Sequence, residues 1–120
     1  MAKKLWSIFT GDDLETCFYT FRTDGIERHH IFGGADRARS EKYGFVVPLH
    51  RSVHPNGAFR TDANWMELDH WLKRKCQEYY IEVAMIGTRD DWYREFGRFY
   101  DDRCNERVWI DKEFEWELKT

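Results

Sequence analysis

Short apolar runs bounded by turn residues make up the first part of the chain, a pattern that predicts β-strands. Leu5–Phe9 is expected to form a short strand or an N-terminal arm, and Thr16–Phe21, which is rich in β-forming residues, a full strand. Asp24 and Gly25 are a strong tight-turn signal. Ile26–Phe32 is therefore expected to return as the second strand of a hairpin.

A loop and another strand are predicted after the glycine pair at residues 33–34, which interrupts the strand pattern. Residues 35–42 are polar and charged, so we expect a loop or one short helix there. Phe45–Leu49 is apolar and predicts a strand, and Pro48 places that strand at a sheet edge or near its own end. Pro55-Asn56-Gly57 ends whatever structure follows it.

Helical periodicity dominates the second half of the chain. Residues 65–81 carry one apolar face, formed by Trp65, Leu68, Leu72, Cys76 and Tyr79 or Tyr80. Residues 81–86 are apolar and predict an extended connector. Thr88 can cap a further helix that buries Trp92 and Phe96 and stops at Gly97.

The tail from Val108 alternates apolar and acidic residues with a period of two, which predicts a final strand that could pair with an open sheet edge.

Together the elements predict an α+β fold. The 120 residues have the length of a single domain. They include 21 aromatic residues (six Trp, six Tyr and nine Phe), more than one small core can hide, so we expect some on a partner-facing surface.

The cysteines do not form a disulfide pattern. Cys17, Cys76 and Cys104 are odd in number and include no C-x-x-C pair. No signal-peptide pattern and no apolar run long enough to span a bilayer is present. We therefore expect free thiols, a reducing intracellular compartment and no membrane partner.

Charge is distributed unevenly along the chain. Residues 1–60 contain 9 Lys and Arg against 7 Asp and Glu, a balance of +2, whereas residues 61–120 contain 10 against 15, a balance of −5. Residues 28–60 contain six basic and two acidic residues. A local positive potential of this kind favours a phosphate-bearing ligand, although a less acidic half of an acidic protein has the same balance.

Four of the five histidines fall between Glu27 and Gly57: His29, His30, His50 and His54. Neighbouring residues of a regular strand point to opposite faces, so His29 and His30 can aim at one point only if the strand end twists near the glycine pair. His50 and His54 share a face if their segment is helical. The whole combination indicates a metal or phosphate site, and the alternative is a set of solvated or core histidines.

These residues also carry a resemblance to a known family. The runs E-R-H-H-I-F-G-G and S-E-K-Y-G-F-V-V-P-L, and then L-D-H-W-L-K-R-K-C-Q and R-D-D-W-Y-R-E-F-G-R-F-Y, resemble the small phage-encoded HNH (His-Me finger) endonucleases related to the recombination enhancement function (Ref) group. The resemblance covers roughly residues 14–100, with an acidic, aromatic tail at 101–120. It implies a single HNH-like domain, a ββα-metal core followed by C-terminal helices, and a cytoplasmic phage protein acting inside a bacterial host.

The resemblance also implies roles for individual residues. His29 and His54 would bind a divalent metal, with His50 as a possible additional ligand, and His30 would be the general base. The metal would be Mg²⁺, with Mn²⁺ or Zn²⁺ as alternatives. Contacts to DNA phosphates would come from Arg28, Arg37, Arg39, Lys42, Arg51 and Arg60.

The chain departs from the family pattern where such proteins hold a structural zinc ion. Cys17 is present, but Thr20 stands where the family pattern has its partner cysteine. His50 and Val53 stand where the pattern has the two later cysteines. One Cys and one His cannot close a tetrahedral zinc site, so we expect this ion to be lost, with Phe18, Tyr19 and Phe21 filling its volume.

Three functions are therefore open. The first is a metal-dependent HNH-type DNA endonuclease. The second is a catalytically silent HNH scaffold that binds and inhibits a host protein, such as a defence nuclease, through its acidic and aromatic C-terminal half. The third is a DNA-binding accessory module without catalysis. The sequence does not determine the oligomeric state.

Overall fold

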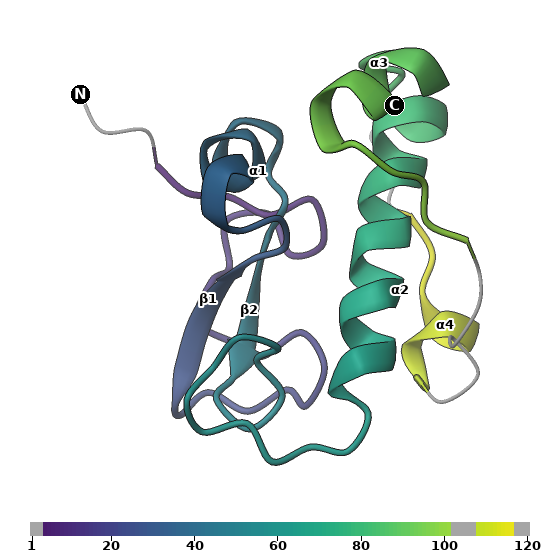
Figure 1. Cartoon of the computed structure of the whole chain (residues 1–120). Coiled ribbons are helices and arrows are strands. Elements are labelled where there is room, and N and C mark those ends of the chain that lie inside the picture. The colour runs from purple at the N-terminus through teal and green to yellow at the C-terminus, as the bar shows by residue number, and fades with distance from the viewer. Residues whose placement is uncertain (1–3, 102–107, 117–120) are drawn as a thin grey trace.

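The computed structural model describes residues 4–101 and 108–116 of an α+β domain, in which a two-stranded antiparallel sheet lies on one side, next to the longest helix (Figure 1). Its strands are β1 (Ile26–His30) and β2 (Val46–His50). In the register His29 lies opposite Val47 and Ile26 opposite His50. Both predicted strands are thus confirmed with slightly different bounds.

The predicted hairpin between residues 16–21 and 26–32 is wrong, because β1 pairs with β2 instead. The backbone N–H of Phe21 donates to the carbonyl of Cys17, and this tight turn is incompatible with a strand. The N–H of Phe18 donates to the Pro48 carbonyl, so the turn lies along the outer edge of β2. Of the two alternatives for residues 5–9, a short strand or an N-terminal arm, the strand does not form, and only a single bridge joins Ser7 to Gly11.

The turn ends in an unusual backbone conformation. Phe21 has φ of +63°, in the left-handed region that glycine adopts freely and a bulky side chain does not. For a residue with a Cβ this conformation costs about 1–2 kcal/mol. The Phe21 side chain is also 66% exposed, so burial does not offset that cost.

Helical structure connects the two strands, as one of the two alternatives for residues 35–42 predicted. A short 3₁₀ turn (Gly34–Asp36) leads into α1 (Arg37–Tyr43). The buried Ser40 hydroxyl donates to the carbonyl of Phe32 and accepts from its N–H, which ties α1 to the end of β1. At Gly44, which ends α1, a Cβ would lie 2.7 Å from the Trp6 ring, so only glycine fits there.

The longest helix, α2 (Trp65–Glu78), stands beside the sheet (Figure 1). It buries Leu68, Leu72 and Cys76 of the predicted apolar face together with Trp71, whereas Trp65 at its start is only partly buried. The extended connector predicted for residues 81–86 is wrong, because a π-helical turn (Tyr79–Val83) continues directly from α2. No helix within the described residues is long and apolar enough to cross a bilayer.

The next helix, α3 (Arg89–Phe96), has the predicted ends. Thr88 and Asp91 form a reciprocal capping box at its start, and Gly97 ends it with φ of +81°. Trp92 and Phe96 are buried, as the sequence predicted.

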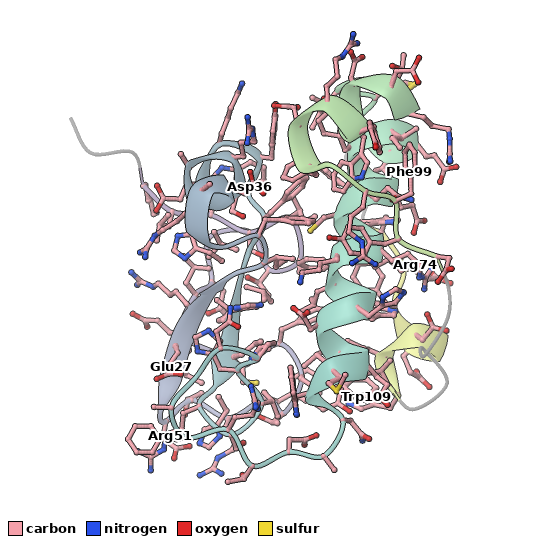
Figure 2. The ribbon with its side chains drawn as sticks, in the orientation of Figure 1. Glu27, Asp36, Arg51, Arg74, Phe99 and Trp109 are labelled. Atoms are coloured by element: carbon pink, nitrogen blue, oxygen red, sulfur yellow. The ribbon has the colours of Figure 1, made fainter. Side chains whose placement is uncertain are left out.

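The predicted final strand does not form in residues 108–116, while Glu117 and Leu118 lie outside the described residues. A single helical turn, α4 (Ile110–Glu113), takes its place. Its backbone groups bond locally, and the Asp111 carboxylate accepts from the Trp71 indole at 2.8 Å and from Arg74 at 2.7 Å. These contacts hold the segment on α2, on the side where Figure 2 shows Arg74.

Two tyrosines and one carboxylate join α1, the π-helical turn and α3. Tyr43 and Tyr80 both donate to Glu95, at 2.7 Å and 2.6 Å. Burial and this hydrogen bond to a carboxylate raise the pKa of Tyr43 to about 12, and the same two causes raise the pKa of Tyr80. Both hydroxyls therefore stay protonated in the folded state beyond pH 10.

Stability is consequently expected to fall as the pH rises above about 10. Unfolded tyrosines ionise near pH 10, whereas the folded state keeps these protons until about pH 12 at Tyr43. The stabilisation is fully present below pH 10 and is lost between these values. Thermal unfolding between pH 8 and 11.5 measures this slope, which Glu95→Gln should flatten. The exposed carboxylate variant Glu82→Gln should keep the wild-type slope, and equal slopes in all three proteins would contradict the assignment.

Candidate metal and phosphate site

His29 is a buried polar side chain on the face of β1 that points towards α2. It lies opposite Val47 in the sheet, and only 1% of its surface is exposed. The centroid of its ring is 4.8 Å from that of His54, with the two rings nearly perpendicular. The structure thus brings together the two histidines that the family resemblance assigns to a metal, although their role stays a prediction.

His54 reaches this position through a loop of turns, not through a helix after β2. The N–H of Val53 bonds the His50 carbonyl, and the N–H of Gly57 bonds that of His54. The Nδ1 atom of His54 is 2.6 Å from a Glu27 carboxylate oxygen. A Cβ at position 57 would lie 3.0 Å from both that oxygen and the His54 side chain, so a larger residue there would require this pair to shift.

Asp69 on α2 is the third member of the group, and the sequence reasoning missed it. Its Oδ1 atom is 3.7 Å from His29 Nε2, too long for a hydrogen bond, and its Oδ2 atom accepts from Lys73 at 2.9 Å. The signal was present, because Asp69 follows the buried Leu68 and stands four residues before a lysine. It therefore faces the edge of the core with a counter-ion one turn away.

Charge in this group is divided between a neutral ring and an ionised carboxylate. Burial lowers the pKa of His29 more than the neighbouring carboxylate raises it. Burial would raise the pKa of Asp69, but the contacts with His29 and Lys73 outweigh it and hold that pKa below its ordinary value. A neutral imidazole and an anionic oxygen are the forms in which His and Asp bind metals.

The His29 Nε2 atom is buried without a hydrogen-bond partner in the described part of the chain. An unpaired buried nitrogen destabilises a fold and calls for an explanation, of which a bound ion is one. Among residues 4–101 and 108–116, no three His, Cys, Asp or Glu side chains are already spaced to enclose a metal. The donor types fit a divalent transition metal. In this structure two of the donors are paired with other side chains, His54 with Glu27 and Asp69 with Lys73.

His30 lies on the opposite face of β1 from His29, as neighbouring residues of a regular strand do. The twist that would aim both rings at one point is not observed. The Nε2 atom of His30 is instead 2.9 Å from the Glu41 carboxylate of α1. The predicted base thus has an orienting carboxylate but does not share the His29–His54 side of the sheet.

His50, the possible additional ligand, is also directed away from His29. It pairs with Ile26 across the sheet and so shares the face of His30. Its Nδ1 atom is 2.8 Å from the Ser52 hydroxyl, and its Nε2 atom is 4.0 Å from an Asp24 oxygen. The structure therefore gives His50 polar partners of its own and does not bring it to the His29–His54 pair.

The predicted phosphate contacts differ in their exposure and in their neighbours. Arg28 shares the His30 face of β1, and α1, which supplies Glu41 to His30, carries Arg37 and Lys42. All three are exposed, and the Lys42 ammonium lies 5.1 Å from the centre of the Tyr43 ring. The other three side chains have partners within the protein. Arg39 pairs with Asp36 at 2.6 Å, and Arg51 stacks on Phe59. Arg60 stacks 3.6 Å from the centre of the Trp65 ring and donates to the Pro55 carbonyl. Figure 2 shows Arg51 and Glu27 near the same end of the sheet.

Two of the positions at which the family pattern places a structural zinc ion, Cys17 and Val53, lie in the apolar core. The Cys17 sulfur is fully buried and accepts a hydrogen bond from the Thr20 N–H at 3.2 Å, while Val53 is buried in the same core cluster. Tyr19 belongs to this cluster and Phe18 packs against it. Phe21 is not part of it, because its side chain is exposed and lies beside Trp109. Cys76 is free and buried, and Cys104 lies outside the described residues.

No protein-family model, no curated protein and no solved structure matches this chain. The site must therefore be interpreted from its own geometry and chemistry.

Proposed function

We propose that the protein is a metal-dependent DNA endonuclease of the HNH type. The observation that carries the proposal is the convergence of His29 and His54, 4.8 Å apart, around a buried nitrogen without a partner beside Asp69. The three side chains come from β1, from the loop that follows β2, and from the long helix α2 after it.

His29, His54 and Asp69 would hold the ion. Two imidazoles and one carboxylate suit Mn²⁺, Zn²⁺ or another transition metal better than Mg²⁺, which prefers oxygen ligands. A bound divalent ion supplies Lewis-acid stabilisation of the charge that develops on a phosphodiester. Lys73, already 2.9 Å from Asp69, adds positive charge next to the group.

His30 would act as the general base, oriented by Glu41. It lies on the other face of β1, but β1 pairs only with β2 among the described strands, so its second edge is open. A phosphodiester at that edge would lie between the two faces. Arg28, which shares the His30 face, and Arg37 on α1 would hold the DNA backbone there.

Supercoiled plasmid incubated with Mn²⁺ or Mg²⁺ tests this function. Nicking is expected with Mn²⁺ and is expected to fall about 100-fold or more in His30→Ala, because general-base catalysis contributes about 10²–10⁴-fold. The matched control is His70→Ala, since His70 is on the outer part of α2 and donates to the Asp101 carbonyl. Absence of metal-dependent nicking under every condition would refute the nuclease.

One observation favours the second function, a silent HNH scaffold that binds a protein. The His30–Glu41 contact directs the only proposed base away from the His29–His54 pair. On this alternative the protein binds Mn²⁺ or DNA without cutting, or neither, and its partner contacts the acidic C-terminal segment. Deletion of residues 101–120 is a poor test, because Val108 and Ile110 are buried in the core; surface substitutions are required.

A further inference from the structure

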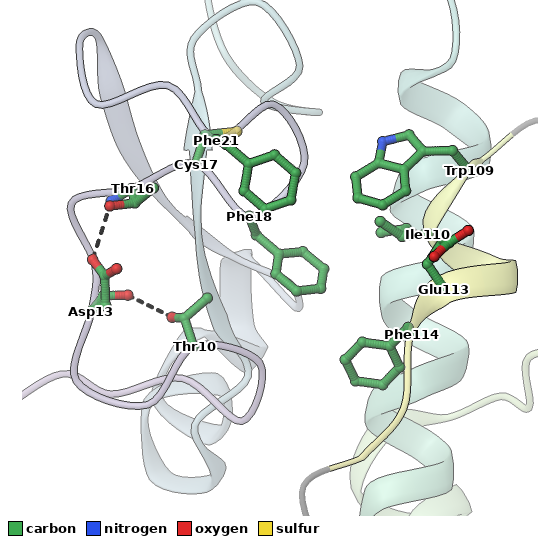
Figure 3. A pocket seen from close by; sticks show the side chains of 10 residues that line it. All are labelled: Thr10, Asp13, Thr16, Cys17, Phe18, Phe21, Trp109, Ile110, Glu113 and Phe114. Carbon is green, nitrogen blue, oxygen red and sulfur yellow. Dashed lines mark hydrogen bonds between the residues drawn. The ribbon is translucent and has the colours of Figure 1, made fainter.

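An apolar pocket of about 350 Å³ lies between residues 10–21 and residues 109–114, which include α4. None of the residues that line it belongs to the histidine group of His29 and His54. Figure 3 shows the rings of Phe18 and Phe21 on one wall pointing towards Trp109 and Phe114 on the other. Across the pocket the ring centroids of Phe21 and Trp109 are 5.7 Å apart, and those of Phe18 and Phe114 are 6.0 Å apart. The volume lies within the range of about 300–1,000 Å³ that is typical of ligand sites.

Phe21 is the most informative residue of this pocket. Its backbone occupies the left-handed region at φ of +63°, where a glycine would fit without strain. Its ring is 66% exposed, so the strain is not offset by burial in the core. Strained residues of this kind concentrate at binding sites, and here the strained conformation places an aromatic ring at the pocket mouth.

Trp109 provides the facing ring, with 42% of its surface exposed. Its segment is held by buried neighbours on either side, Val108 and Ile110, and by Asp111, which accepts from Trp71 and Arg74. The pocket wall is therefore fixed before any ligand arrives. Preorganisation of this kind reduces the entropy cost of binding.

The charged residues of the pocket are both acidic. Asp13 and Glu113 line it from opposite walls, and among the side chains that the structure describes no basic one lines the pocket. Hydrogen bonds from the backbone N–H groups of Glu15 and Thr16 hold the pKa of Asp13 below its usual value. Glu113 and Glu115 are exposed on the C-terminal segment. A ligand with positive charge beside an apolar group is complementary to this pattern.

We propose that this pocket docks a segment of a partner protein, through one large apolar side chain flanked by Lys or Arg. The apolar anchor packs in the pocket against the paired rings of Phe21 and Trp109, and its basic neighbours face Asp13 and Glu113. This inference stands apart from nuclease activity, since none of the pocket residues belongs to the histidine group. It gives the partner of the protein-binding alternative a chemical class.

Three synthetic peptides test the proposal: Lys-Lys-Trp-Lys-Lys, the same peptide with Ala at the centre, and Glu-Glu-Trp-Glu-Glu. Binding to the ¹⁵N-labelled full chain is followed by NMR, with the Trp109 indole as a local reporter. The basic Trp peptide is expected to bind at least about tenfold more tightly than either of the others. Equal affinity of the Ala peptide, or of the acidic peptide, would overturn the proposal.

Variants of the pocket complete the test. Phe21→Gly relieves the backbone strain, so it should lose about tenfold in peptide affinity while its thermal midpoint stays at or above that of the wild type. Trp109→Ala and Glu113→Lys should weaken binding likewise. The controls are Phe59→Ala, another exposed ring, and Glu82→Lys, another exposed carboxylate. Wild-type affinity in the pocket variants, or an equal loss in the controls, would exclude this pocket as the docking site.

Discussion

Replacing Trp92 with alanine is expected to destabilise the fold by about 3–5 kcal/mol, the range for removal of a large aromatic side chain from a core. Trp92 is fully buried, and its ring lies 4.2 Å from that of Phe96 and 5.4 Å from that of Tyr80, centroid to centroid. Its indole N–H also donates to the Arg98 carbonyl at 2.9 Å. The substitution leaves a cavity and an unpaired carbonyl, which add to the lost burial.

Chemical denaturation at pH 7 measures this loss, and Tyr93→Ala is the matched control. Tyr93 is the next residue of α3, but 55% of its surface is exposed, so its truncation should change the stability by less than about 1 kcal/mol. A loss at Trp92 no larger than that at Tyr93 would mean that α3 does not pack on the core. Because small domains have only about 5–15 kcal/mol of stability, Trp92→Ala should unfold at markedly lower denaturant concentration.

The helices α2 and α3 were predictable because their signals are local. The apolar residues of α2 recur with the period of an α-helix. The ends of α3 are set by Thr88 and Gly97, which act within a few residues. The strands β1 and β2 were also predictable as elements. Their pairing was not, because the Asp24-Gly25 signal favoured a hairpin with residues 16–21, and only tertiary contacts decide between two apolar partners.

The tail shows why a period of two can mislead. Val108 and Ile110 are both buried, as the alternation indicated. Residues 110–113 nevertheless form a helical turn and not a strand. Asp111 decides the outcome, since its carboxylate bonds Trp71 and Arg74 on α2. Arg74 and Trp71 precede Asp111 by 37 and 40 positions in the sequence, so these contacts leave no local signal.

The candidate site was predictable in part for the same reason. The spacing of the histidines suggested a group, and His29 and His54 do come together. The sequence indicated that Asp69 faces the edge of the core beside a lysine, but it could not reveal that Asp69 lies next to His29 or that α1 supplies Glu41 to His30. Both depend on how helices pack on the sheet. The roles of these residues in metal binding and catalysis remain predictions.

Replacing Asp69 with asparagine is expected to weaken Mn²⁺ binding by about 10–100-fold, with a similar loss of any metal-dependent cleavage. The two side chains have nearly the same shape, so the change removes the charge while keeping the volume. Asp69 holds its proton less tightly than a free aspartate, beside His29 and Lys73. Its negative charge is therefore present at neutral pH, where it would attract a cation to the unpaired Nε2 atom of His29.

Calorimetric titration with Mn²⁺ and line broadening of the His29 and His54 ring signals by the paramagnetic ion measure the effect independently of cleavage. His29→Ala should weaken Mn²⁺ binding at least as much as Asp69→Asn, because it removes a proposed ligand. Glu41→Gln is the matched control, since Glu41 contacts His30 on the other face of the sheet and its loss should leave Mn²⁺ affinity unchanged. Wild-type affinity in both Asp69→Asn and His29→Ala would place the metal elsewhere, whereas broadening confined to these two rings in the wild type would locate it between β1 and α2.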